Sequence, residues 1–285
     1  MRLFILYLAV LSLCLSPVSC RAEEPGSAVE MLALNVGKAD CILLRVEGHA
    51  YLVDTGYKRS SDQMLAMLAH EGVTHLDGVF LTHEHKDHYG GLNALVSSAI
   101  KIDAFYTSAY CLDGFGAKHH AVSAAAQRGQ TVNYLKSGDA VEISDTARFT
   151  VLGPTKAAKD NENNNSLVMR LETAEGSILL TGDMKFDEEY CLITGGLLSQ
   201  TDVLKVAFHG DNTSTSTSFL NAVKPRVGVI STSSAEEKDT PSRETLYRLA
   251  SVGCKTYVTQ DAPSAVRVTL SAGNIDVRME DWQAD

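Results

Sequence analysis

The segment His83–His88 constrains the fold of this chain more than any other feature. It places three imidazoles and the carboxylate of Asp87 directly after an apolar run, Gly78–Thr82, which predicts a buried strand. Neutral imidazole and carboxylate are the ligand types that suit zinc, manganese or iron, and a loop at a strand end can turn them towards one point. Gly90 and Gly91 then let the backbone turn closely. A histidine-rich surface loop is the alternative, but the density of ligand types favours a metal site.

Short β-type runs alternate with helical patterns along the rest of the chain. Helices are predicted after Ser60 or Ser61, and over Pro241–Val252 with Thr240 as N-cap. Two halves that each begin with strands and end with helices predict an α/β protein in which two sheets pack face to face, a four-layer αββα sandwich. The predicted strands are Met31–Val36, Cys41–Val46, Tyr51–Asp54, Gly78–Thr82, Leu167–Leu171, Ile178–Thr181, Val203–Phe208, Val227–Ser231, Ala265–Leu270 and Asn274–Met279.

Residues 1–22 have the pattern of a secretory signal peptide. Arg2 precedes an apolar run, Leu3–Leu15, that is too short to span a bilayer as a helix, which takes about 20 residues. We therefore expect a secreted or extracytoplasmic protein that lacks a transmembrane domain. Lipid attachment at Cys20 is the less favoured alternative. The polar stretch 156–165 is too short to separate independent domains, so residues 23–285 are predicted to form a single domain.

Charge and cysteine content narrow the partners and the compartment. The chain has 35 acidic and 25 basic residues, a formal charge of −10, which argues against broad adhesion to nucleic acid or anionic lipid. The net charge does not exclude a local basic groove. The cysteines beyond the signal segment are too far apart in the sequence for a structural zinc ribbon. They could form one or two disulfides, or they could be four buried free thiols. These cysteines are Cys41, Cys111, Cys191 and Cys254.

The His-x-His-x-Asp-His pattern of His83–His88 is the hallmark of the metallo-β-lactamase superfamily, which this chain resembles. Val53–Gly56 resembles the early Asp-Thr-Gly turn of that family, and Leu180–Asp183 resembles its later Thr-Gly-Asp turn. The resemblance implies the αββα fold. It also implies that Asp183 bridges two metals and that Asp54 braces the metal loops without binding a metal itself.

Within the superfamily, the likeness is to the hydrolase domain of the ComEC-type DNA-uptake protein and its free-standing relatives. It extends over about residues 30–280, without the channel, and includes Asn35–Cys41, Asn163–Val168 and Leu204–Gly210. No histidine lies near Asn163–Ser166, where many members supply a further ligand to the first metal. The chain departs from the group's pattern at Asn35, Lys38, Ala39, Phe208 and Asp211, and Phe208 replaces the first of two paired histidines.

The resemblance implies two divalent ions, zinc or manganese, with a hydroxide between them. We expect His83 and His85 to bind one ion, and Asp87, His88 and His209 to bind the other, with Asp183 shared. Two such ions lower the pKa of the shared water towards neutrality and clamp charge on the substrate. Asp87 and His209 are the expected catalytic residues.

Several further residues are candidates for support or substrate contact. Asn164 could offer an amide oxygen or hold a water, or it could be a turn residue that bonds its own backbone. Ser214 could contact a phosphate or cap a helix. Lys205 and Lys38 could attract an anion, although an isolated lysine is usually a solvated surface group. The remaining candidates are Ser166, as support, and the pair His119 and His120, as lining of the site mouth.

Three functions follow from this sequence. The first is a secreted metal-dependent hydrolase acting on a phosphate ester or phosphodiester, with a small molecule or a phosphodiester as partner. Nucleic acid is not favoured, because of the charge and because the sequence lacks an aromatic and basic run of the kind that grips single strands. A β-lactamase-type amide hydrolase is the second, and a degenerate member that binds metal or a partner without catalysis is the third.

Overall fold

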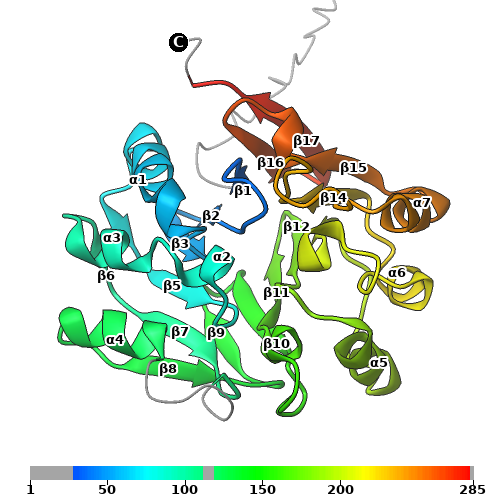
Figure 1. Ribbon diagram of the computed structural model, residues 1–285, viewed down its shortest axis with the longest axis horizontal. Helices are drawn as coiled ribbons and strands as arrows, with labels where there is room; N and C mark the ends of the chain where they lie inside the picture. The colour runs from blue at the N-terminus through cyan, green and yellow to red at the C-terminus, as the bar shows by residue number, and fades with distance from the viewer. Residues whose placement is uncertain (1–27, 112–118, 283–285) are drawn as a thin grey trace, which may run out of the picture.

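The computed structural model describes residues 28–111 and 119–282; the predicted signal segment lies outside these ranges. Two large sheets dominate the described chain (Figure 1). The first contains, in spatial order, β17 (Asn274–Glu280), β16 (Ala265–Ser271), β1 (Val29–Leu34), β2 (Ile42–Val46), β3 (His49–Val53), β5 (Gly78–Leu81), β7 (Phe105–Ser108) and β8 (Val132–Leu135).

The second sheet is built mainly from the second half of the chain. It changes from antiparallel pairing between β9 and β12 to parallel pairing between β12 and β15. A separate short pair joins β4 (His75–Leu76) to β6 (Lys101–Ile102). The order in the second sheet is β15 (Lys255–Val258), β14 (Val227–Ile230), β13 (Val203–Lys205), β12 (Gly176–Leu180), β11 (Val168–Thr173), β10 (Arg148–Gly153) and β9 (Ala140–Glu142).

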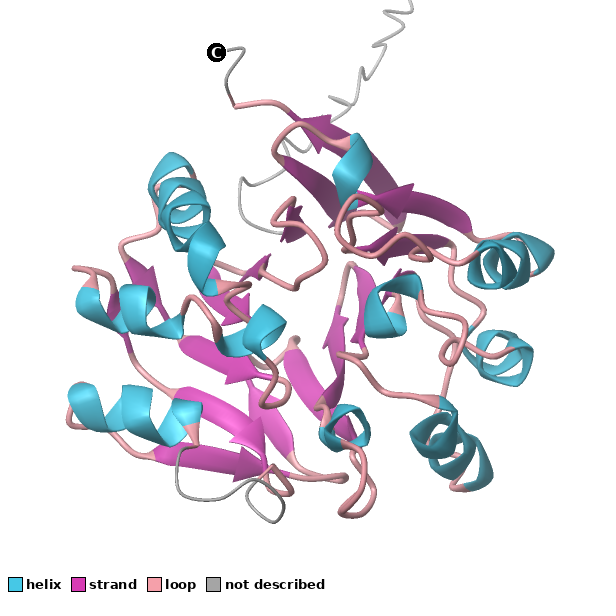
Figure 2. Ribbon diagram, in the orientation of Figure 1, coloured by secondary structure: helices cyan, strands magenta, loops and turns pink. Residues whose placement is uncertain are grey.

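Helices cover the outer face of each sheet, which confirms the predicted four-layer αββα sandwich (Figure 2). Helices α1, α3 and α4 share a core with the first sheet, and α5, α6 and α7 share one with the second. The helices are α1 (Ser61–His70), α2 (Lys86–Tyr89), α3 (Leu92–Ser97), α4 (His120–Gln127), α5 (Phe186–Thr194), α6 (Thr217–Val223) and α7 (Arg243–Ser251), with 3-10 turns η1 (Lys58–Ser60), η2 (Glu162–Asn165), η3 (Ala207–Gly210) and η4 (Thr259–Asp261).

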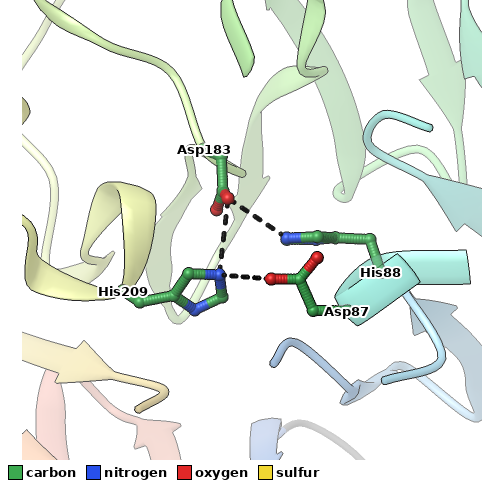
Figure 3. A group of neighbouring side chains, drawn as sticks. All are labelled: Asp87, His88, Asp183 and His209. Atoms are coloured by element: carbon green, nitrogen blue, oxygen red, sulfur yellow. Dashed lines mark ion pairs between the residues drawn. The ribbon is translucent and has the colours of Figure 1, made fainter. Parts of the chain in front are cut away.

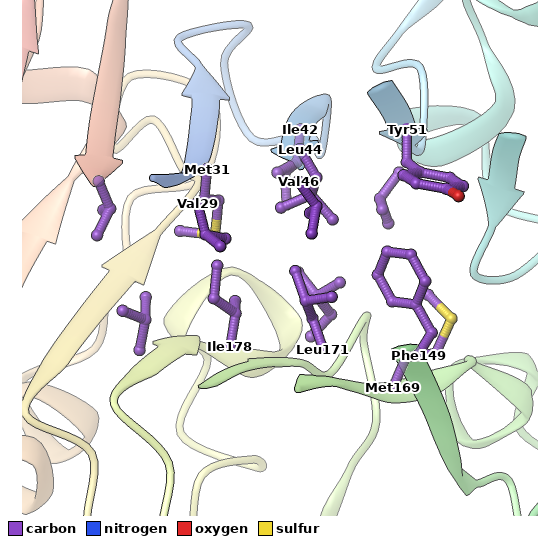
Figure 4. Close-up of a cluster of buried hydrophobic side chains, with 14 of the residues drawn as sticks. Val29, Met31, Ile42, Leu44, Val46, Tyr51, Phe149, Met169, Leu171 and Ile178 are labelled. Atoms are coloured by element: carbon purple, nitrogen blue, oxygen red, sulfur yellow. The ribbon is translucent and has the colours of Figure 1, made fainter. Parts of the chain in front are cut away.

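The central core lies between the two sheets (Figure 4). Alternate residues of the strands point inward, so that Met31 and Leu44 of the first sheet lie opposite Leu171 and Ile178 of the second. The ring of Phe149 packs edge-on to that of Tyr51, with the centroids 5.1 Å apart. Because this apolar layer holds the sheets together, the loops at their common edge keep a fixed position relative to one another.

The C-terminal hairpin, β16 and β17, belongs to the first sheet, although it lies in the second half of the chain. Strand β16 pairs antiparallel with β1, and Val29 lies opposite Leu270. The division into two halves that each supply one sheet is therefore only approximate, because the C-terminal hairpin completes the first sheet and ties the two ends of the described chain together.

The boundaries of two predicted elements are wrong for local reasons. Strand β13 ends at Lys205, and the chain then turns into η3, where Phe208 and His209 adopt left-handed backbone angles that a strand cannot hold. Helix α7 begins at Arg243, and its N-cap is Ser242, not Thr240: the Ser242 hydroxyl accepts a hydrogen bond from the backbone N–H of Thr245.

The four cysteines in the described ranges are free thiols, and Cys191 alone among them is partly exposed. The alternative of one or two disulfides is thus wrong for these residues. Within residues 28–111 and 119–282, no helix is both long and apolar enough to cross a membrane.

Candidate metal centre

Four chain segments meet at one edge of the sandwich, and each brings a carboxylate or imidazole. The turn after β3 supplies Asp54, and the turn after β12 supplies Asp183. The loop and short helix after β5 supply the His83–His88 segment, and η3 after β13 supplies His209. All four segments follow the carboxyl ends of strands, where side chains from distant parts of a chain are brought together.

Asp87, His88, Asp183 and His209 form one compact group (Figure 3). The Nε2 atoms of His88 and His209 lie 3.3 Å and 3.4 Å from the same oxygen, Oδ2 of Asp183. Oδ2 of Asp87 lies 3.5 Å from Nε2 of His209. The side chain of Asp87 is 17% exposed, whereas those of the other three are 0–2% exposed, so Asp87 faces the open side of the group.

His83, His85 and Asp183 form a second group that shares the aspartate. Nε2 of His83 lies 3.8 Å from Oδ2 of Asp183 and 2.9 Å from Nδ1 of His85. One carboxylate oxygen of Asp183 therefore faces imidazole nitrogens from both groups. This arrangement suits a carboxylate that bridges two cations.

Three buried atoms of these groups fit metal ligands because no hydrogen bond satisfies them, and the contacts of the two imidazole nitrogens are ion pairs with Asp183 and Asp87. Nε2 of His88, Nε2 of His209 and Oδ1 of Asp183 make no hydrogen bond within the described part of the chain. Leaving buried polar atoms unsatisfied costs about 1–3 kcal/mol each, and they are rare in folded proteins unless a ligand satisfies them. Two divalent cations would satisfy all three.

Asp54 fixes the orientation of His88 from behind. Its Oδ2 accepts a hydrogen bond from Nδ1 of His88 at 2.7 Å, and its Oδ1 accepts from the backbone N–H of Thr82 at 2.8 Å. Burial lowers the pKa of His88, but the carboxylates of Asp183 and Asp54 outweigh burial and hold that pKa well above the ordinary range. The bond to Asp54 leaves Nε2 of His88 as the atom that faces the group.

A backbone carbonyl does the same for His209. Nδ1 of His209 donates to the carbonyl oxygen of Ser231 at 2.8 Å, which directs Nε2 towards Asp183 and Asp87. Burial lowers the pKa of His209, whereas Asp183 and Asp87 raise it to about 9 overall. Protons on His88 and His209 thus balance the carboxylates where no cation is bound, and bound cations would replace those protons. Burial instead holds the pKa of His83 well below its ordinary value.

Hydrogen bonds and close packing hold the turn that carries Asp183. The hydroxyl of Ser166 accepts from the backbone N–H of Asp183 at 3.1 Å, and the amide oxygen of Asn164 accepts from the backbone N–H of Lys185 at 2.8 Å. Gly182 has φ +49°, and a Cβ there would lie 2.8 Å from Cβ of Ser166. Only glycine fits both this conformation and this packing.

The structure corrects three expectations about supporting residues. Asn164 is not a turn residue that bonds its own backbone, because its oxygen holds a segment 21 positions away. Lys205 is not a solvated surface lysine, because it is 1% exposed and its Nζ lies 3.0 Å from Oδ1 of Asp40. Ser214 neither caps a helix nor offers its hydroxyl to a phosphate. It is fully buried, its hydroxyl donates to the carbonyl of Ala207, and Ser216 caps α6 instead.

Two supporting residues were not predicted from the sequence. Asp40 pairs with Lys205, and the signal was its position in the Asn35–Cys41 segment. Glu84 lies inside the metal motif; its Oε2 is 2.5 Å from Nδ1 of His120 and its Oε1 is 3.2 Å from Nδ1 of His119. Burial lowers the pKa of His119, although the carboxylate of Glu84 raises it in part. His120 lines a cavity beside α2.

The fold and the site together define a metal-dependent hydrolase. The chain belongs to the metallo-beta-lactamase superfamily, which it matches over residues 34–234. Members of this superfamily bind divalent metals, often two. The family resemblance found in the sequence is thereby confirmed.

Known relatives include competence proteins. The chain is 29% identical over 263 residues to Competence protein ComA of Neisseria gonorrhoeae, covering 90% of this chain and 35% of that protein. It is 28% identical over 186 residues to ComE operon protein 3 of Bacillus subtilis (strain 168), covering 65% and 24%. The chain thus spans a quarter to a third of these relatives.

A solved structure shows the same fold at low sequence identity. CmlA, a diiron β-hydroxylase from Streptomyces venezuelae, superimposes with a TM-score of 0.58 at 13% identity, over 84% of this chain and 54% of that one. At this identity the likeness concerns the fold alone.

Proposed function

We propose that this hydrolase acts on a phosphate ester or phosphodiester through a dinuclear metal centre. His83, His85 and Asp183 hold one zinc or manganese ion, and Asp87, His88, His209 and Asp183 hold the other. When bound, two such ions supply an ionised water as nucleophile and neutralise charge on the phosphoryl group. Asp87, on the open side of the group, orients the water. His209 is the second catalytic residue, and the carbonyl of Ser231 fixes the orientation of its imidazole.

One observation supports an anionic substrate in particular. The amines of Lys38 and Lys185 lie 5.5 Å and 4.6 Å from the ring centroid of Phe208, directly beside His209. Lys38 follows β1, Lys185 follows Asp183, and Phe208 stands in η3, so each comes from a different loop at the site edge. Two cations around the ring of the residue before His209 suit the negative oxygens of a phosphoryl group.

Turnover of bis(4-nitrophenyl) phosphate by protein loaded with zinc or manganese tests this proposal. We expect product release well above that of the His85→Ala variant, which lacks a proposed ligand. We also expect Lys38→Ala/Lys185→Ala to raise KM more than it lowers kcat. Release no faster than that of His85→Ala would exclude the proposed reaction, and turnover of nitrocefin instead would favour an amide hydrolase.

We further propose that the protein is exported and that cleavage after Cys20 or Ala22 removes its N-terminal segment. The charge and apolar pattern of this segment supports the proposal. N-terminal sequencing of protein secreted from expressing cells is expected to begin at Arg21 or Glu23. An intact Met1, or a lipid on Cys20, would contradict this cleavage.

A further inference from the structure

A cavity of about 330 Å³ lies beside α2, outside the two metal-ligand groups. This volume is at the lower end of the range of small-molecule sites, about 300–1,000 Å³. Its walls come from η1 and the residue before it, from α2, and from the starts of α3 and α4. The aromatic and basic side chains that line it are Tyr57, Lys58, Arg59, Lys86, Tyr89 and His120.

The cavity is basic in a chain whose net charge is −10. None of the described residues that line it is acidic. Arg59 is paired with Glu236 at 2.6 Å, but Lys58 and Lys86 are exposed and form no ion pair within the described ranges. Two unbalanced ammonium groups at one cavity attract an anion.

Two tyrosine rings give the cavity aromatic walls. The guanidinium of Arg59 lies 3.8 Å from the ring centroid of Tyr57, and the imidazole of His120 stacks on Tyr89 with centroids 3.5 Å apart at 11°. The stacked pair of His120 and Tyr89 forms a flat surface of the kind on which a planar ring stacks, and Arg59 adds a cation over the ring of Tyr57.

The wall formed by His120 and Tyr89 is fixed in advance by the metal loop. Glu84, between two of the proposed ligands, accepts a hydrogen bond from the backbone N–H of His120 at 3.1 Å and contacts its Nδ1. Lys86 and Tyr89 belong to the same short helix as Asp87 and His88. A ligand in the cavity would therefore lie next to the metal centre.

We propose that this cavity binds a nucleoside phosphate. Lys58 and Lys86 contact its phosphate, and the tyrosine walls stack against its base. Aromatic and basic residues together are the combination that binds nucleotides, and the fold assembles it here from three chain segments. This site holds whether or not the metal centre cleaves phosphodiesters, because its residues are distinct from the metal ligands.

Calorimetric titration of metal-free protein with AMP at low ionic strength tests the proposal separately from catalysis. We expect saturable binding that Lys58→Ala/Lys86→Ala weakens by about tenfold or more, the effect of losing a charge-assisted hydrogen bond. The matched control is Lys101→Ala/Lys136→Ala, which removes two exposed lysines elsewhere and is expected to leave the affinity within about twofold.

Two further titrations identify the ligand more closely. Inorganic phosphate is expected to bind much more weakly than AMP, because it has no ring to stack. A tetranucleotide, dT4, that binds more tightly than dTMP indicates a nucleotide unit of a strand, whereas equal affinities indicate a free nucleotide. Absence of AMP binding, equal effects of the two double variants, or phosphate binding as tightly as AMP would overturn the proposal.

Discussion

Nδ1 of His88 donates to Oδ2 of Asp54 across 2.7 Å, and both side chains are fully buried. The bond fixes the tautomer of His88 so that Nε2 points at Asp183. Asp54 itself has a left-handed backbone, with φ +59°, and lies in the turn directly after β3. Asp54, which contacts no proposed substrate, thus determines which nitrogen of the proposed metal ligand His88 faces the centre.

Asp54→Asn is therefore expected to weaken metal binding by about 10- to 100-fold, because the amide is a poorer acceptor for Nδ1–H. Competition with a chromophoric chelator measures the affinity. Asp139→Asn is the control, since Asp139 accepts from the backbone N–H of Lys136 at 2.9 Å and belongs to none of the groups of possible metal ligands in the described ranges. Equal affinities of the two variants would show that Asp54 does not support the centre.

The buried pair of Lys205 and Asp40 stabilises the fold below the centre. Lys205→Met leaves Asp40 buried without its cation, which is expected to lower the free energy of unfolding by about 3–5 kcal/mol. Urea denaturation measures the loss. Arg148→Met, which breaks the exposed pair with Glu172, is expected to lose at most about 1 kcal/mol. Similar losses in both variants would contradict the importance of burial.

Asp77 makes a pH-dependent contribution to stability. Burial raises its pKa, but hydrogen bonds from His49 and from the backbone N–H of Ala50 outweigh burial and hold the pKa below the ordinary value of 3.8. The stabilisation is thus fully present above about pH 4 and is lost as pH falls below 3.8 towards the folded-state pKa.

Asp77→Asn is consequently expected to lower the free energy of unfolding by about 1 kcal/mol at pH 7. The difference from the wild-type chain should shrink at pH 3, where the carboxyl becomes protonated. Urea denaturation at the two pH values tests this. A difference that stays constant, or one that grows at pH 3, would contradict the assigned direction of the pKa shift.

The local parts of the site could be predicted from sequence, and the tertiary parts could not. The segment His83–His88 concentrates its ligand types within one turn, so it was recognisable without any knowledge of packing. Asp183 and His209 needed the family resemblance, because nothing local links them to that segment. The pairing of Lys205 with Asp40 depends on two loops meeting at the sheet edge, which no short-range pattern encodes.

The fold shows the same difference between local features, which the sequence predicts, and tertiary features, which it does not. Strands with continuous apolar runs, such as β5 and β14, were identified because both faces are buried. The interior strands β7 and β10, the strand β15 and the short pair β4 and β6 were not predicted. Strands β8 and β9 were missed as well. They end their sheets, most of their residues are not buried, and edge strands of this kind lack a hydrophobic pattern.

Anomalous diffraction from crystals of manganese- or zinc-loaded protein tests the central claim most directly. We predict two peaks that share Asp183 as a common ligand, one contacted by His83 and His85 and the other by Asp87, His88 and His209. A single peak, no peak, or peaks that do not contact Asp183 would contradict a dinuclear centre built from these residues.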